Sequence, residues 1–344
     1  MINHTISPNW NGFNIFTTKL KRIQDNIKSK KCNKNKSPCK YCGHVFTSSC
    51  NYSINNVISW DNTLLHYIKK HSIKPNKNFI DRIYGYRIPY DNMDIVKKIK
   101  SSTYIMNNLR FVKITKNQLA IMDALMEHGG YVKKYTTDVN KYKYSEHSGT
   151  LDFTRKGLSK IIINCEESRL ESQDSDVLQP NVDIDMSEYE YIFHTHPPTP
   201  FPGARAKEGI LYEFPSISDI IHFKYNYNKN LLQGSIVITP EGLYNIRKKE
   251  LDNKKIYFDD DKFIRKFNKI CGDIDDKTIN KYGKHIDIDY FYSTIAQDKS
   301  FIYEFNEYLS EYSIYIDYFS RVKIANNKWI LDDVYIPVYA IEKK

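Results

Sequence analysis

Between residues 111 and 250, runs with strand-like alternation are interleaved with runs of helical spacing, and this order constrains the fold more than any other feature. FVKIT is rich in β-formers, and KNQLAIMDALMEHGG places apolar residues at helical intervals before a Gly-Gly stop. EHSGTLDFT and KIIIN are expected to pair across the turn at 155–159, and EYEYIFHTHP to form a strand ending at Pro197. SDIIHFKYNYN is expected to be helical and GSIVITPEGLYNIRK to be a hairpin. The alternation predicts an α/β domain over residues 110–250.

The rest of the chain divides into three further segments. Residues 1–30 are polar, with a helix expected over 16–27, and residues 31–85 contain a cysteine-rich stretch and a helix expected from Trp60 to His71, capped by Asp61. Residues 251–344 form a Tyr-rich C-terminal extension of α+β character, in which SIYIDYF and KWILDDVYIPVYAI are expected to be strands around a turn at 326–327. Residues 165–187 are expected to form an acidic loop.

Composition limits the location and the partners. The net charge of +10 comes mostly from Lys, and abundant Lys, Asn, Ile and Tyr are typical of an AT-rich genome such as that of a large DNA virus, which weakens an inference from charge to nucleic acid. We find no run of about 18 apolar residues and no secretory signal, so we expect no membrane partner, and a cytoplasmic location (host cytoplasm or virion for a viral protein). Six cysteines, four of them between Cys32 and Cys50, are unlike a secreted disulfide framework; we expect a reducing compartment in which the clustered cysteines bind metal.

His194 and His196 are candidate metal ligands. Side chains repeat every two residues along a strand, so the two imidazoles point to the same side at the strand end. The pair alone also fits a polar strand end without metal. Farther along, Ser216-Ile217-Ser218-Asp219 has the capping-box pattern of a helix start, in which Ser216 is the N-cap.

Together these residues match a catalytic metal site. Three protein ligands plus water are usual for catalytic zinc, and His194, His196 and Asp219 supply such a set. Amide hydrolysis also requires a general base and a donor for the oxyanion, for which Glu146 and Ser216 are candidates.

The order of these pieces resembles the JAMM/MPN+ metalloprotease family, whose members include zinc-dependent deubiquitinating isopeptidases. The resemblance rests on the helix KNQLAIMDALMEHG, EHSGTL, HTHP, PSISD and the strand GSIVITPEG, and covers residues 110–250. It implies a β-sheet between helices, related to cytidine deaminases, with His194, His196 and Asp219 as zinc ligands, Glu146 as general acid/base and Ser216 stabilising the tetrahedral intermediate. It also implies ubiquitin or ubiquitin-like conjugates as substrates.

One departure concerns the spacing between the ligands. Twenty-two residues separate His196 from Asp219, where the family has about ten, so a longer loop is expected at the mouth of the site. His147 is expected to be structural, and His222, one helical turn after Asp219, to be a packed histidine or to lie behind the ligands.

The cysteine-rich segment suggests a second, structural zinc. Cys39 and Cys42 with His66 and His71 resemble a zinc finger of the two-cysteine, two-histidine type, although its central spacing is longer than usual. A set of Cys32, Cys39, Cys42 and Cys50 is the alternative, with His44 as a further competitor, and unliganded thiols remain a third reading. The segment could bind nucleic acid or a protein partner.

Two functional alternatives accompany the metallopeptidase hypothesis. The chain could be a scaffold or virion component that keeps the MPN shape without turnover; inactive relatives typically lose ligands, and this chain has all of them. Alternatively, nucleic-acid binding through the zinc finger could be its main task.

Overall fold

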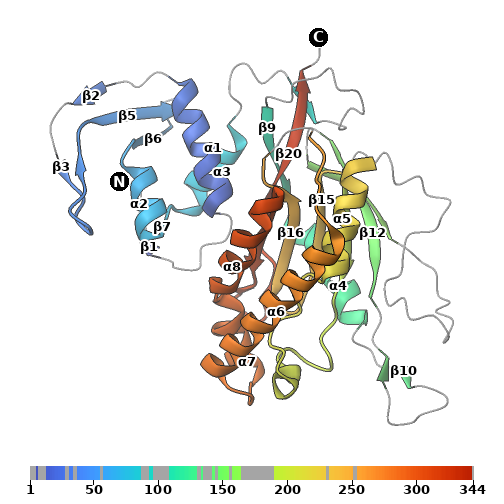
Figure 1. Cartoon of the computed structure of the whole chain (residues 1–344). Coiled ribbons are helices and arrows are strands. Elements are labelled where there is room, and N and C mark those ends of the chain that lie inside the picture. Colours follow the sequence, from blue (N-terminus) through green and yellow to red (C-terminus); the bar gives the residue numbers. More distant parts are fainter. Residues whose placement is uncertain are drawn as a thin grey trace. The chain divides into compact units, whose positions relative to one another are not determined.

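The chain forms two compact units, Met1–Asn92 and Met93–Lys344 (Figure 1). The computed structural model describes residues 5–6, 13–27, 31–33, 37–54, 57–86, 93–95, 108–129, 133–134, 142–143, 146–154, 157–163, 190–229, 232–250 and 254–342. No helix within these ranges combines the length and the apolar character needed to cross a bilayer.

The first unit is built around apolar side chains from three helices. The ring of Phe16 lies 6.1 Å from that of Phe79 and 5.7 Å from that of Tyr84, and Leu20 and Ile68 are fully buried beside helical neighbours. The helices are α1 (Phe13–Asn26), α2 (Leu64–His71) and α3 (Lys77–Gly85). The strands are β1 (Thr5–Ile6), β2 (Lys31–Asn33), β3 (Ser37–Pro38), β4 (Val45–Phe46), β5 (Ser49–Ile54), β6 (Ile58–Asp61) and β7 (Ile73–Lys74). They pair as a sheet of order β2-β5-β6 and as the pairs β1-β7 and β3-β4.

Helix α2 begins four residues later than its sequence periodicity predicts. Trp60 lies on strand β6, where it is buried and packs 5.7 Å from Phe79 and 5.8 Å from Tyr52. Asp61 ends that strand and accepts a hydrogen bond from the Thr63 N–H at 2.7 Å. The expected start was wrong because Trp60 falls at helical spacing from Leu64 although it belongs to β6, where it pairs with Tyr52 of β5.

The second unit contains a six-stranded mixed sheet of order β13-β12-β14-β15-β16-β17. Its strands are β12 (Ser148–Thr154), β13 (Gly157–Ile163), β14 (Tyr191–Thr195), β15 (Gly234–Ile238), β16 (Gly242–Lys248) and β17 (Ile314–Ser320). Only β14 and β15 are parallel in this sheet; the other neighbours are antiparallel. The carboxyl ends of β14 and β15 therefore lie level, with His194 opposite Val237.

Helices cover both faces of this sheet. Side chains of α5 (Ile217–Lys229), α6 (Asp260–Tyr282) and α8 (Ser300–Leu309) share one buried core with Ile192, Val237 and Tyr244 of the strands (Figure 1). Helix α4 (Lys116–Gly129) contacts β14 and β15, and its buried residues lie outside that core, which places α4 on the opposite face. The expected mixed α/β architecture, a sheet flanked by helices, is confirmed.

Smaller elements complete the second unit. A three-stranded antiparallel sheet has the order β8-β20-β9, and β10-β11 and β18-β19 are short pairs. These strands are β8 (Met93–Ile95), β9 (Asn108–Ile114), β10 (Lys133–Lys134), β11 (Tyr142–Lys143), β18 (Val322–Lys323), β19 (Trp329–Ile330) and β20 (Val334–Glu342). The short helices are η2 (Ala204–Glu208), α7 (Ile288–Ser293), η3 (Ile295–Gln297) and η4 (Ser310–Tyr312).

The C-terminal segment is part of the second unit, so the boundary expected at residue 250 does not divide the structure. Both SIYIDYF and KWILDDVYIPVYAI contain strands, and the expected turn at 326–327 is present, where it joins the short pair β18–β19. The long strands on either side pair elsewhere: β17 pairs with β16, and β20 pairs with β9. Alternation along a strand gives no information about which distant strand completes its hydrogen bonds. The pairing of β12 with β13 is confirmed, whereas the acidic loop expected at 165–187 lies outside the described residues.

Candidate metal centres

The end of strand β14 places two imidazoles side by side. The Nε2 atoms of His194 and His196 are 3.1 Å apart, as the alternation along the strand predicts. The His196 N–H donates to the Ile238 carbonyl at 2.8 Å, which extends the pairing with β15 one residue beyond the strand. The main chain therefore fixes both histidines at the same edge of the sheet.

The start of helix α5 brings a carboxylate to these histidines. Oδ1 of Asp219 lies 3.1 Å from Nε2 of His194, and Oδ2 lies 3.6 Å from Nε2 of His196. The N–H and hydroxyl of Ser216 both donate to Asp219 Oδ2, at 2.6 and 2.9 Å, and the Asp219 N–H lies 3.3 Å from the Ser216 hydroxyl oxygen. The capping box is therefore present together with the candidate ligands, and the cap holds the carboxylate in the orientation that faces the histidines.

Electrostatics favour the ionised form of Asp219. Burial alone would raise the pKa of this carboxyl, but the imidazoles of His194 and His196 and the N–H of Ser216 together hold its pKa well below the usual range. An ionised carboxylate is the form that binds a cation. His222 lies farther along α5, and its pKa is lowered by burial and by the nearby His194.

Glu146 lies on the neighbouring chain segment, directly before β12. Its Oε1 is 3.9 Å from Nε2 of His196, and its side chain is 22% exposed, so it borders the cluster and reaches solvent. The His147 N–H donates to the Thr195 hydroxyl at 3.0 Å, and the Thr195 N–H donates to the His147 carbonyl at 2.9 Å. Gly149 follows where a Cβ would overlap the carbonyl oxygen of Ile162, so the strand needs glycine there.

The stretch between His196 and Ser216 is a packed segment that supports His196. Nδ1 of His196 lies 3.0 Å from the carbonyl oxygen of Glu213, which can only accept, so Nδ1 carries the proton and Nε2 presents its lone pair to the cluster. Arg205 holds the Glu213 carboxylate through contacts at 2.9 and 3.2 Å. No sequence pattern identifies this partner, because every residue has a carbonyl group.

The same segment is anchored on the C-terminal helices. The ring of Tyr212 stacks 4.2 Å from that of Phe301 on α8, and its hydroxyl donates to the Ile295 carbonyl at 3.2 Å. Ala206 and Leu211 are also buried in the core of this face. The longer loop expected here is thus fixed by the C-terminal part of the chain.

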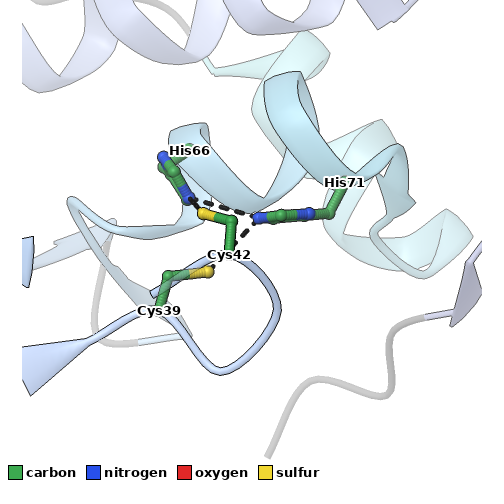
Figure 2. Close-up of side chains that lie close together, drawn as sticks. All are labelled: Cys39, Cys42, His66 and His71. Atoms are coloured by element: carbon green, nitrogen blue, oxygen red, sulfur yellow. Dashed lines mark hydrogen bonds between the residues drawn. The ribbon is translucent and has the colours of Figure 1, made fainter. Parts of the chain in front are cut away.

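In the first unit, two cysteines and two histidines converge (Figure 2). Sγ of Cys39 lies 3.3 Å from Nε2 of His71, Sγ of Cys42 lies 3.4 Å from Nε2 of His66, and the two Nε2 atoms are 3.3 Å apart. The cysteines come from the turn between β3 and β4, and the histidines from α2. All four candidate ligand atoms lie within 4.8 Å of one another.

Cys32, Cys50 and His44, which the sequence offered as competing ligands, do not belong to this cluster. Cys32 and Cys50 face each other across β2 and β5 and are joined by a disulfide, so the all-cysteine set is wrong, as is the expectation that the clustered cysteines are all reduced. Spacing alone does not reveal that these two cysteines occupy opposed positions on paired strands. His44 stacks on His66 at 4.9 Å instead of joining the four candidate ligands.

Both clusters have the chemistry of metal sites. Burial would raise the pKa of the Cys39 thiol, but backbone N–H groups of Tyr41 and Cys42 lower it overall, which favours the thiolate that binds metal. Two sulfurs and two nitrogens fit a closed tetrahedral site, whereas two nitrogens and one carboxylate leave a coordination position for water or substrate.

Comparison with other proteins identifies a viral relative. The chain is 33% identical to "Uncharacterized protein R413" of Acanthamoeba polyphaga mimivirus over 312 residues, which cover 86% of this chain and 85% of that protein. No model of a protein family matches the chain, and no solved structure matches it. The aligned part is long enough to include residues of both units. The chain therefore belongs to the same family as the mimivirus protein R413.

Proposed function

We propose that the second unit is a zinc metallopeptidase of the JAMM/MPN+ type, which hydrolyses isopeptide bonds in conjugates of ubiquitin or a ubiquitin-like protein. The observation that carries the proposal is the convergence of His194, His196 and Asp219, with the Glu146 carboxylate 3.9 Å from His196. Five polar residues from three separate parts of the chain lie close together, as the family resemblance implies: Glu146, His194, His196, Ser216 and Asp219. We also propose zinc as the structural metal of the Cys/His cluster in the first unit.

The protein groups would divide the reaction between them. Bound zinc supplies a Lewis acid that polarises a carbonyl and lowers the pKa of a water molecule. Glu146 would accept a proton from the attacking water at a carboxylate oxygen and return it to the leaving amine nitrogen as the C–N bond breaks. Partial exposure of Glu146 keeps that oxygen accessible to both water and substrate.

Ser216 would stabilise the negative charge that develops on the carbonyl oxygen. Its side chain is exposed at the start of α5, within hydrogen-bond distance of Asp219 Oδ2. The hydroxyl hydrogen points to Asp219 in this arrangement, so donation to the substrate requires rotation about the Cβ–Oγ bond. This rotation leaves the hydrogen bond from the Ser216 N–H to Asp219 in place.

The decisive variant is Glu146→Gln, which removes the base and keeps the shape of the side chain. We expect cleavage of a panel of linked ubiquitin chains to fall by roughly 10²–10⁴-fold, while the metal content measured by mass spectrometry stays the same. Glu307→Gln, an exposed change on α8, is the matched control and should cleave like the parent protein. Chelator should abolish cleavage in every variant.

Undiminished cleavage by Glu146→Gln would contradict the assignment of the base. Full metal loading of the parent protein without cleavage of any chain would instead favour the catalytically silent scaffold. Metal content separates the two sites as well: His196→Ala should lose one metal ion per chain and Cys42→Ala a different one.

A further inference from the structure

The net positive charge of the chain lies in its first unit. Residues 1–92 contain 15 Lys and Arg against 4 Asp and Glu, a net charge of +11, whereas residues 93–344 contain 36 against 37, a net charge of −1. A coding bias toward Lys acts on the whole chain and does not explain this division. A surplus of this size on about ninety residues favours a polyanionic partner for the first unit.

The Cys/His cluster gathers basic and aromatic side chains at one place. Lys40 and Tyr41 lie between the two cysteines, and Lys69 and Lys70 lie between the two histidines. The Tyr41 ring lies 5.0 Å from the ring of the candidate ligand His71, and the Lys40 ammonium lies over the Tyr41 ring. Lys70 directly precedes His71 on α2, and Lys69 precedes Lys70 on the same helical turn. We call Lys40, Tyr41, Lys69 and Lys70 the basic rim.

The rim residues are available for binding. All four are exposed, Tyr41 to 47%, and these lysines form no ion pair within the described residues. The Lys40 ammonium lies 5.0 Å from the centre of the Tyr41 ring, and the other contacts of that ring, with Tyr67 and His71, leave nearly half of its side chain uncovered. The rim thus offers an aromatic face beside three unpaired cations.

We propose that the basic rim binds a single strand of nucleic acid. Lys40, Lys69 and Lys70 contact the phosphates, and a base stacks on Tyr41; this combination of cations with an aromatic platform is how proteins bind unpaired strands without reading their sequence. An acidic protein segment would satisfy the lysines but has no base to stack on the ring. The inference is independent of the proposed hydrolase, because its residues belong to the other unit.

The test measures binding of the full chain to fluorescein-labelled 30-nucleotide oligo(dT) and oligo(U) by anisotropy across a range of KCl concentrations. Affinity for at least one strand should fall steeply with salt. In the triple variant Lys40→Gln/Lys69→Gln/Lys70→Gln, the slope of log K against log[KCl] should become shallower by about 2. The matched control Lys262→Gln/Lys269→Gln/Lys284→Gln removes three exposed lysines of the second unit and should leave the slope unchanged.

The stacking part has its own variants. Tyr41→Leu should weaken binding on the order of ten-fold without changing the salt slope, and Tyr41→Phe should restore it. Metal content and circular dichroism confirm that each variant folds. Absence of binding at 50 mM KCl, equal effects of the two lysine triples, or competition by polyglutamate as effective as that by unlabelled strand would overturn the proposal. Preference for oligo(dT) or for oligo(U) identifies the strand as DNA or RNA.

Discussion

At the scale of single residues, the site in the second unit depends on how one histidine is held. The Nε2 lone pair of His196 faces the cluster because its Nδ1 proton is committed to the carbonyl of Glu213. The carboxylate of Glu213 is held in turn by Arg205, whose side chain is about one-third exposed. A ligand whose other nitrogen is fixed in this way binds metal more tightly than one free to rotate.

Arg205 is not a candidate metal ligand, but the substitution Arg205→Met should weaken metal binding. We expect about ten-fold lower zinc affinity, measured by competition with a chromogenic chelator in a Cys42→Ala background, which disables the other cluster. The metal-free protein should melt at nearly the same temperature, because a partly exposed ion pair adds little stability. Arg265→Met, an exposed change on α6, is the control; an equal effect of both variants would contradict the positioning role.

At the scale of elements, the turn between β15 and β16 contains a buried acid. Glu241 is fully buried; it accepts a hydrogen bond from the Tyr244 hydroxyl at 2.7 Å, and its second oxygen has no partner among the described residues. Burial raises the pKa of Glu241 to about 7. Arg321, which is also buried, donates to the carbonyls of Pro240 and Thr239 in the same turn and pairs with Asp123 of α4.

The raised pKa gives the stability of the protein a specific pH dependence. Between the usual value of 4.5 and about 7, the folded protein keeps the Glu241 proton that the unfolded chain has lost. The contribution of Glu241 to the free energy of unfolding therefore falls as pH rises through this window and is level above it. The fall should total about 3 kcal/mol. Glu241→Gln cannot ionise, so the difference between variant and parent should open between pH 4.5 and 7.

Urea denaturation of metal-free protein at pH 4.5, 6 and 8 measures this difference. The exposed Glu250→Gln should follow the parent protein at every pH. A constant offset between Glu241→Gln and the parent would mean that Glu241 ionises normally in the fold.

At the scale of the whole molecule, the C-terminal ninety residues belong to the same fold as the candidate site. Strand β17 forms the edge of the central sheet, and Phe301 and Phe305 of α8 pack in the core that includes helix α5, which supplies Asp219. The segment that supports His196 also rests on these helices.

A chain ending at residue 250 should therefore not fold. We expect residues 93–250 to be insoluble or to lack a cooperative thermal transition, whereas residues 93–344 should show one, since removing the segment exposes the apolar core of one sheet face. Expression of both fragments and differential scanning calorimetry test this. A cooperative transition and metal binding by residues 93–250 would show that the extension is a separate addition.

The local pattern of this sequence was sufficient to predict α4, the β12–β13 pair, β14, α5 and the β15–β16 hairpin, because each depends on periodicity within a few residues. It also selected the ligand candidates, since alternation puts His194 and His196 on one side and the capping box marks the start of α5. Contacts between distant segments could not be predicted from this local pattern. The pairing of β17, the Cys32–Cys50 bond and the Glu213 carbonyl behind His196 depend on which segments meet in space. Periodicity along the chain does not indicate which distant segments come into contact, so only the tertiary structure determines these contacts.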